Sequence, residues 1–344
     1  MSERPVIELK NITKIFGGDP SIALEMLKQG KSKDEVQAET GQVIGLNDVS
    51  LEVKRGEIFV VMGLSGSGKS TLIRHVNRLI DPTSGAILVN EQDVLAMDME
   101  QLREFRRHDV AMVFQNFGLM PHRNVLENVA YGLEIRGVEK SERRKVASEW
   151  IDTVGLQGYE LSRPHELSGG QQQRVGLARA LAMDSDVLLM DEAFSALDPL
   201  IRSGMQDQLL SLQKKLHKTI FFITHDFDEA IRIGDRIGVL KDGVLVQTGR
   251  PEDIILKPAN EYVADFVRDV NRARVIRVGA IMDKSQLAPC EAAVPATSTC
   301  EDVLPLFASH DWVGVLDENE KRVGAISAKR VIAALARHSE ALSS

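Results

Sequence analysis

Four short runs of apolar residues stand out along the first two thirds of the chain. They occupy residues 57–63, 110–115, 186–192 and 219–225, and each ends abruptly in glycine or polar residues. Continuous apolar runs separated by helical stretches predict the buried strands of a parallel sheet that is covered on both faces. Ligands bind at the carboxyl ends of such strands. We therefore expect one edge of the sheet to collect the residues that end the runs: Gly63 to Ser70, Gln115, Asp191, Glu192 and His225.

A two-helix insertion is predicted near the N-terminus, over residues 17–43. It lies between a strand that ends at Phe16 and the next strand, LNDVSLEV. Gly30 is placed to end the first helix, and Ser32 and Glu35 have the spacing of a capping box for the second. An insertion of this kind is usually a surface elaboration, and we interpret it so.

Two further regions complete the predicted architecture. Residues 116–170 are mostly helical in pattern and are interpreted as a helical subdomain that follows the strand ending at Gln115. From about residue 275 the pattern changes to helix, hairpin and helix, which predicts a separate small domain. The fold class is thus α/β over residues 1–270, with a small α+β domain over 275–344.

Composition narrows the class of protein. The 344 residues are 43% hydrophobic, and 42 basic against 50 acidic residues leave a net charge of −8, which argues against a general nucleic-acid binder. Cys290 and Cys300 form no disulfide framework, as expected in a reducing cytoplasm. The apolar runs are far shorter than the roughly twenty residues of a membrane span, and the N-terminus has no signal-peptide pattern. If the protein works at a membrane, another chain must cross it.

The strongest motif is GLSGSGKS, Gly63 to Ser70, between a predicted strand and a predicted helix. Its glycines let the backbone wrap a phosphate chain, while Lys69 reaches the outer phosphates and the Ser70 hydroxyl can ligate Mg²⁺. The alternative is a glycine–serine turn that matches by chance. The motif indicates a nucleoside triphosphate without selecting among kinases, GTPases and transport ATPases.

Polar residues at the ends of the other strands narrow the chemistry towards hydrolysis. Asp191 is placed to assist Mg²⁺, and Glu192 could deprotonate an attacking water. The alternative is two solvated acids at a strand end. His225 could hold the γ-phosphate or position the water, although a lone histidine is more often structural. The amide oxygen of Gln115 could reach Mg²⁺ or the water.

A second candidate anion site lies at residues 167–174, LSGGQQQR, where a turn precedes a helix. A plain loop-to-helix cap is the alternative. The longer stretch HELSGGQQQRVGLARAL resembles the signature of ATP-binding-cassette proteins. The phosphate loop, Gln115, VLLMDEAFSALD and FITHD follow that family's order over residues 6 to about 265. The resemblance implies a head-to-tail pair of chains, in which the second site serves the partner's ATP.

The resemblance also implies roles for single residues. Phe16 would stack on adenine, unless it is a packed core aromatic, and Asp198 would lie in the loop at the dimer boundary. Glu192 and His225 would be catalytic, and Ser70, Gln115 and Asp191 would hold Mg²⁺. The implied ATP contacts are Phe16, Gly63, Leu64, Ser65, Gly66, Ser67, Gly68, Lys69, Ser70 and Thr71. The implied contacts with the partner's ATP are Ser168, Gly169, Gly170 and Gln171.

Within that family, the insertion and the segment AMVFQNFGLMPHRNVLENVAYGLE are similar to ATP-binding subunits of glycine betaine, proline and choline importers. The tail resembles a CBS module in a single copy. This resemblance implies three partners: a second copy, an integral membrane permease, and a periplasmic or lipid-anchored solute-binding protein. It also implies work at the cytoplasmic face of the inner membrane. An importer of another small solute, a soluble cassette factor and a nucleotide sensor remain as alternatives.

Overall fold

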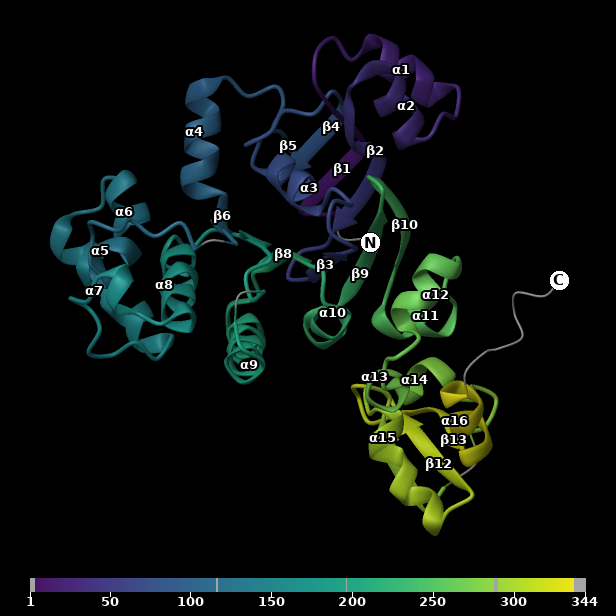
Figure 1. Ribbon diagram of the computed structural model, residues 1–344. Helices are drawn as coiled ribbons and strands as arrows, with labels where there is room; N and C mark the ends of the chain where they lie inside the picture. The colour runs from purple at the N-terminus through teal and green to yellow at the C-terminus, as the bar shows by residue number, and fades with distance from the viewer. Residues whose placement is uncertain (1–3, 116, 196, 288–289, 337–344) are drawn as a thin grey trace. The chain divides into compact units, whose positions relative to one another are not determined.

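The computed structural model describes residues 4–115, 117–195, 197–287 and 290–336 (Figure 1). Contacts divide the chain into two compact units, Met1–Val246 and Gln247–Ser344. We expected the first domain to extend to residue 270, but the division falls earlier. The reason is that α11 (Pro251–Leu256) packs on α12 (Glu261–Val267) and α13 (Arg272–Val275).

The central sheet of the first unit has six strands in the order β10-β9-β3-β8-β7-β6. The pairs β3–β9, β3–β8, β8–β7 and β7–β6 are parallel, which confirms the predicted parallel sheet. Strands β3, β8 and β7 are buried along their whole length, as expected of strands covered on both faces, whereas the edge strand β10 has no buried residue. The strands are β3 (Ile58–Met62), β6 (Val110–Val113), β7 (Val187–Asp191), β8 (Thr219–Thr224), β9 (Arg236–Lys241) and β10 (Val244–Gly249).

The strand register brings the carboxyl ends of three strands together. Met62 of β3 pairs with Thr224 of β8, and Asp191 of β7 pairs with Ile223 of the same strand. The residues that follow these strands therefore meet at one edge, as predicted. Two of the helices that contact this sheet begin near the same edge: α3 (Lys69–Val76) packs on β7 and β8, and α10 (Phe227–Ile233) packs on β3 and β8.

A second, antiparallel sheet has the order β2-β1-β4-β5 and shares a hydrophobic core with the central sheet. The predicted insertion forms the connection between β1 and β2, which pair up to Phe16 and Val43. Its two helices, α1 (Ser21–Lys28) and α2 (Lys33–Thr40), enclose a small core, and the predicted capping box of Ser32 and Glu35 is present. The strands are β1 (Ile7–Phe16), β2 (Val43–Val53), β4 (Ser84–Val89) and β5 (Gln92–Asp93).

The helical subdomain has its own hydrophobic core, which includes Val129, Ile151 and Val175. The subdomain begins with two short helices, α5 and α6, and its core continues through α8 to Ala182. Two helices outside this group lie on either side of it in sequence, α4 (Met99–His108) and α9 (Pro199–Leu216). The subdomain helices are α5 (Val125–Val129), α6 (Tyr131–Ile135), α7 (Lys140–Thr153) and α8 (Gly169–Ala182).

The second unit contains the predicted hairpin of β12 (Trp312–Leu316) and β13 (Arg322–Ser327), followed by the helix α16 (Ala328–Leu335). A third strand, β11 (Ala292–Pro295), pairs parallel with β12 and was not predicted. The remaining helices are α14 (Val278–Ile281) and α15 (Cys300–Val303). The likeness of this unit to a CBS module stays a prediction. Within the described residues, no helix combines the length and apolar character needed to cross a bilayer.

Candidate functional site

The phosphate loop, Gly63 to Ser70, connects β3 to α3 as the motif predicts. Gly63 and Gly68 have φ values of +156° and +103°, a region that L side chains rarely adopt. Space excludes side chains there as well. A Cβ on Gly63 would lie 2.2 Å from the Leu240 oxygen, and one on Gly68 would lie 2.4 Å from the Gly45 oxygen. These glycines therefore let the loop pass against two neighbouring backbones.

Lys69 is the first residue of α3, and its side chain is only 4% exposed. Its Nζ donates hydrogen bonds to the carbonyl oxygens of Gly63 (2.9 Å) and Leu64 (3.0 Å). Burial lowers the pKa of Lys69, and the nearby carboxylates of Glu192 and Asp191 oppose that shift. The ammonium group is thus held at the loop, while Leu64, Ser65 and Gly66 at the loop tip are exposed.

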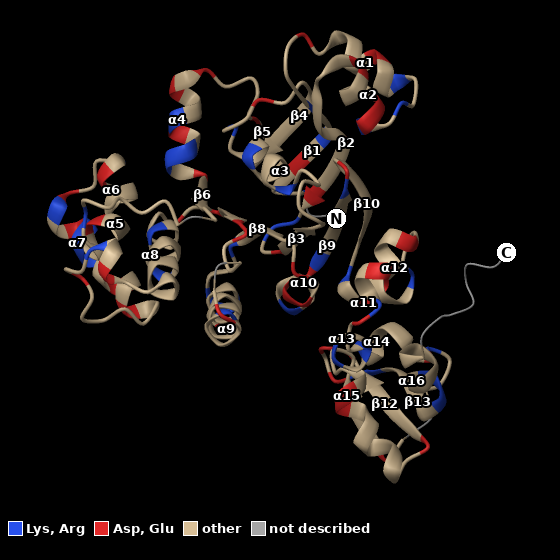
Figure 2. Ribbon diagram, in the orientation of Figure 1, with Lys and Arg blue, Asp and Glu red and all other residues tan. Residues whose placement is uncertain are grey.

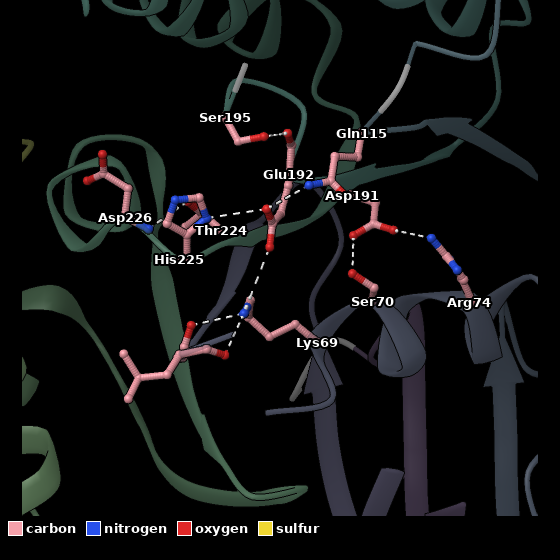
Figure 3. A network of polar contacts seen from close by, with 12 residues as sticks. Lys69, Ser70, Arg74, Gln115, Asp191, Glu192, Ser195, Thr224, His225 and Asp226 are labelled. Carbon is pink, nitrogen blue, oxygen red and sulfur yellow. Dashed lines mark hydrogen bonds and ion pairs between the residues drawn. The ribbon is translucent and has the colours of Figure 1, made fainter. Parts of the chain in front are cut away.

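Asp191, the last residue of β7, is completely buried. Its Oδ1 accepts a hydrogen bond from the Ser70 hydroxyl (2.8 Å), and its Oδ2 accepts one from Nη2 of Arg74 (3.2 Å) (Figure 3). The structure thus brings together two of the three predicted Mg²⁺ ligands. The third, Gln115, donates its amide Nε2 to Glu192 at 3.1 Å instead.

The oxygen donors at this edge fit Mg²⁺. A hydroxyl, a buried carboxylate and an amide are hard ligands, which Mg²⁺ prefers over nitrogen or sulfur. In the described ranges, no group of three or more His, Cys, Asp or Glu side chains is arranged to hold a metal. A metal at this edge would therefore depend on water and substrate phosphates for further ligands, which is usual for Mg²⁺ in nucleotide sites.

Glu192 follows Asp191 in a strained backbone conformation with φ of +47°. Three hydrogen bonds hold that backbone. The Glu192 N–H donates to the Ile223 oxygen (3.0 Å), and the Glu192 oxygen accepts from the hydroxyl (2.9 Å) and the N–H (3.2 Å) of Ser195. The carboxylate then points into the site (Figure 3). Its Oε2 lies 3.3 Å from Nδ1 of His225, and its Oε1 lies 3.9 Å from Nζ of Lys69.

The second candidate anion site is the start of α8. Ser168 caps this helix in a complete capping box: its hydroxyl accepts from the Gln171 N–H (3.3 Å), and the Gln171 side chain accepts from the Ser168 N–H (2.9 Å). Ser168 and Gly169 are exposed, and Gly170 is buried against α9, where a Cβ would lie 2.9 Å from Ile201. The polar contacts of Ser168 thus stay within its own helix turn and do not join it to Lys69.

Asp198 caps α9, accepting a hydrogen bond from the Ile201 N–H at 3.1 Å. Because Ile201 is also the residue that contacts Gly170, the predicted signature and the predicted dimer loop are neighbours in space. This proximity could not be read from the sequence, in which the two motifs lie almost thirty residues apart.

Phe16, the last residue of β1, is 39% exposed and is therefore not a core aromatic. Its ring lies against Gly45, since a Cβ there would be 2.7 Å from the ring. Gly45 in turn lies against Gly68 of the phosphate loop. Lys14 Nζ lies 5.1 Å from the ring centroid. An exposed aromatic ring thus stands beside the loop, and Thr71 lies in α3 just after the loop. The stacking of Phe16 on adenine stays a prediction.

Sequence reasoning missed three residues at this site. Arg74 contacts Asp191, and its spacing four residues after Ser70 was a usable signal, because residues i and i+4 share a helix face. Gly243, in the turn between β9 and β10, donates its N–H to the Ser67 oxygen at 2.9 Å. Neither Gly243 nor Gly45 belongs to a motif, so only the tertiary structure identifies them as supports of the loop.

The fold and this site define a P-loop NTPase of the ATP-binding-cassette class. Comparison with known proteins supports this. A family model described as ABC transporter matches residues 46–195. A dimeric solved structure, the ATP-binding cassette MJ0796 in a post-hydrolysis state bound to ADP and Pi, is similar with a TM-score of 0.62 and 32% identity. The match covers 71% of this chain and 98% of that one.

Relatives that align with most of this chain are ATP-binding proteins of transport systems. The glycine betaine transport ATP-binding protein OpuAA of Bacillus subtilis is 50% identical over 95% of this chain and 78% of its own length. The trimethylamine N-oxide transport ATP-binding protein TmoW of Pelagibacter ubique is 46% identical over 95% of this chain and 96% of its own length. The chain belongs to the family of ABC transporter ATP-binding proteins, which are ATPases coupled to transport.

Proposed function

We propose that this chain hydrolyses ATP to drive the import of a quaternary-amine or related methylated-amine osmoprotectant through a separate membrane permease. The observation that carries the hydrolytic part is the placement of Glu192. Its carboxylate faces His225 and Gln115 on one oxygen and the phosphate-loop lysine on the other. A carboxylate in this position is suited to activating water beside a bound triphosphate.

ATP is bound first by residues that this chain presents in one place. The loop from Gly63 to Thr71 takes the phosphates, with Lys69 held in place by two carbonyls, and Phe16 offers its exposed ring to the adenine. Ser70, Asp191 and Gln115 are the residues that would hold Mg²⁺. When bound, the ion offsets negative charge on the terminal phosphates.

Glu192 then takes a proton from water at Oε2 or Oε1, and the His225 ring positions the γ-phosphate or that water. The side chain of His225 is 53% exposed, so it can turn towards a ligand without unpacking the core. Backbone strain at Glu192 is offset by its hydrogen bonds to Ile223 and Ser195, which fix the carboxylate before substrate arrives.

Completion of the site requires a second copy of the chain, docked head to tail. The start of α8 offers exposed Ser168 and Gly169 and the amide groups of a helix N-terminus, which favour an anion. In this arrangement Ser168, Gly169, Gly170 and Gln171 cover the γ-phosphate held by the partner. Asp198 lies at the boundary, because its helix packs against Gly170.

The permease docks on the groove between the central sheet and the helical subdomain. This groove has a volume of about 550 Å³ and an apolar lining that includes Phe114, Ile135 and Met183. Part of its lining is basic: Arg103, Arg106 and Arg107 come from α4, whose arginines are blue in Figure 2. The groove is next to Gln115, so movement of the helical subdomain on ATP closure would reach the permease.

The solute class follows from the relatives. Glycine betaine and trimethylamine N-oxide share a trimethylated nitrogen, and an extracytoplasmic solute-binding protein with an aromatic cage would select it. The ATPase itself works at the cytoplasmic face of the inner membrane, as a peripheral subunit, and does not contact the solute.

The test is Glu192→Gln in the chain reconstituted with its permease and solute-binding protein in vesicles. The variant should bind ATP as the wild type does, accumulate as a dimer and lose turnover by a factor of about a hundred or more. Uptake of labelled glycine betaine should fall in parallel. Undiminished turnover would remove Glu192 from its role, and ATP turnover that no methylated amine stimulates would overturn the proposed solute class.

A further inference from the structure

Asp191 has a cationic partner to which the proposed function gives no role. This carboxylate is completely buried, and an ionised buried carboxylate is costly unless charge and hydrogen bonds compensate it. Ser70 donates a neutral hydrogen bond to Oδ1 at 2.8 Å. A positive charge in direct contact comes from Arg74, whose Nη2 lies 3.2 Å from Oδ2.

The two cations of α3 differ in their freedom to move. Lys69 is almost fully buried, and two carbonyl oxygens of the loop hold its Nζ. The Arg74 side chain is 40% exposed, and its guanidinium can turn to water without leaving a buried charge behind. Arg74 lies one helical turn after Ser70, so both side chains reach Asp191 from the same face of α3.

We propose that Arg74 is the resident counter-ion of Asp191, and that it competes with Mg²⁺ for this carboxylate. Arg74 is then a positioning residue. It holds Asp191 in place while no divalent cation is bound, and it withdraws into solvent when the cation binds. This inference rests on the proposed function, since it assumes that Asp191 faces a metal–nucleotide complex.

Competition has a definite sign. A metal that must displace the guanidinium binds more weakly than it would at an unpaired Asp191. Removing the positive charge of Arg74 should therefore increase the affinity for the metal and lower the stability of the metal-free protein. A purely structural ion pair has the opposite signature, because its loss would loosen Asp191 and weaken the protein and its metal binding together.

The experiment measures Mn²⁺ binding to the full chain loaded with ADP, which avoids hydrolysis. Mn²⁺ is followed by electron paramagnetic resonance against a protein-free ADP blank, and melting is recorded without divalent cations. We expect Arg74→Gln to lower the Kd for Mn²⁺ by about threefold to tenfold, the effect of one partly exposed ion pair, and to lower the metal-free Tm. Arg74→Lys, which keeps the charge, should bind Mn²⁺ with a Kd between those of Arg74→Gln and the wild type.

Arg55→Gln is the matched control. Arg55 forms a surface ion pair with Asp186, with 3.4 Å between the two side chains, and neither residue belongs to the phosphate loop. It should leave the Kd for Mn²⁺ unchanged. An unchanged or higher Kd in Arg74→Gln overturns the proposal, as does a lysine variant that binds as tightly as the glutamine variant. Metal-free binding of a fluorescent ADP analogue is measured in parallel. Failure of the wild type to bind it would count against the proposed function rather than against Arg74.

Discussion

Two helices of the first unit begin at candidate anion sites, and they begin differently. At α3 the N-cap is Gly68, in a left-handed conformation and without a side-chain cap. At α8 the N-cap is Ser168, which closes a complete capping box with Gln171. A helix start without a side-chain cap leaves backbone N–H groups available to a ligand. The start of α3 is therefore built to be completed by phosphate, whereas the start of α8 is already stable by itself.

The surroundings of the two helix starts differ in the same way. Around α3 the chain places the Glu192 carboxylate 3.9 Å from Lys69 and 3.3 Å from His225, while the neighbouring Asp191 accepts a hydrogen bond from Ser70. Around α8 the neighbours are the apolar side chain of Ile201 and the cap of the next helix. The start of α3 is surrounded by candidate catalytic groups. The start of α8 has exposed residues that could lie over a phosphate, and the neighbours described above are not candidate catalytic groups. In the proposed head-to-tail dimer, the two are halves of one site.

The largest effect is expected from a complementation experiment on these halves. Lys69→Ala removes the phosphate-loop cation, and Ser168→Arg blocks the start of α8, so each homodimer should lack turnover. An equal mixture should regain roughly a quarter of the wild-type ATP turnover, because half of its dimers are mixed and each mixed dimer carries one of two intact sites. ATP turnover is measured after the subunits of the two homodimers have exchanged to form mixed dimers. A mixture as inactive as its components would contradict the head-to-tail arrangement.

Ser168→Ala tests the α8 half more gently. Loss of the cap should cost about 1 kcal/mol in the free energy of unfolding. Turnover should fall by about tenfold or more, because a contact to the partner's phosphate is lost. ATP affinity of the isolated chain should not change. Ser32→Ala is the matched control, since it removes the same kind of capping box from α2. Equal turnover losses in the two variants would make Ser168 an ordinary cap.

Gly243→Ala tests the support of the α3 half. Gly243 has φ of +81°, and a Cβ would lie 2.9 Å from the Gly45 oxygen, so the turn must shift away from Ser67. We expect a loss of about 1–3 kcal/mol in stability and a several-fold weaker ATP affinity, measured by denaturation and by nucleotide titration. Gly204→Ala in the exposed part of α9 meets no atom within 4 Å and should be neutral or stabilising. An unaffected ATP affinity in Gly243→Ala would show that the turn does not support the loop.

The smallest effect concerns pH. Because burial lowers the pKa of Lys69, the folded chain binds fewer protons at this side chain than the unfolded chain at alkaline pH. The stability of the wild type relative to Lys69→Met should therefore rise as the pH increases from the lowered pKa towards the ordinary value of about 10.4. This contribution is complete above the ordinary value and is lost as the pH falls through the lowered one. The free energy of unfolding of both proteins is measured by denaturation at several pH values. A difference between the two that does not change across this range would contradict the prediction.

Features that depend only on residues close together in the sequence were predictable. The phosphate loop needs a strand, glycines and a helix in continuous order, and GLSGSGKS supplies them locally. The capping box of Ser32 and Glu35 depends on three residues of spacing, and it is present. The strand β11 was missed for the opposite reason. Its stability comes from pairing with β12, about twenty residues later, and a four-residue strand has little pattern of its own.

The sequence by itself determined the chemistry: a phosphate loop, two adjacent carboxylates after a buried strand, and a second helix start able to face an anion. These depend on residue types at short spacing, which local backbone physics converts into turns, caps and strand ends. Only the tertiary structure decided which of these residues contact one another. It placed Gln115 on Glu192, Arg74 on Asp191, Gly243 under the loop and Gly170 against α9. Such contacts depend on how distant segments pack, and packing leaves no periodic signal in any one of them.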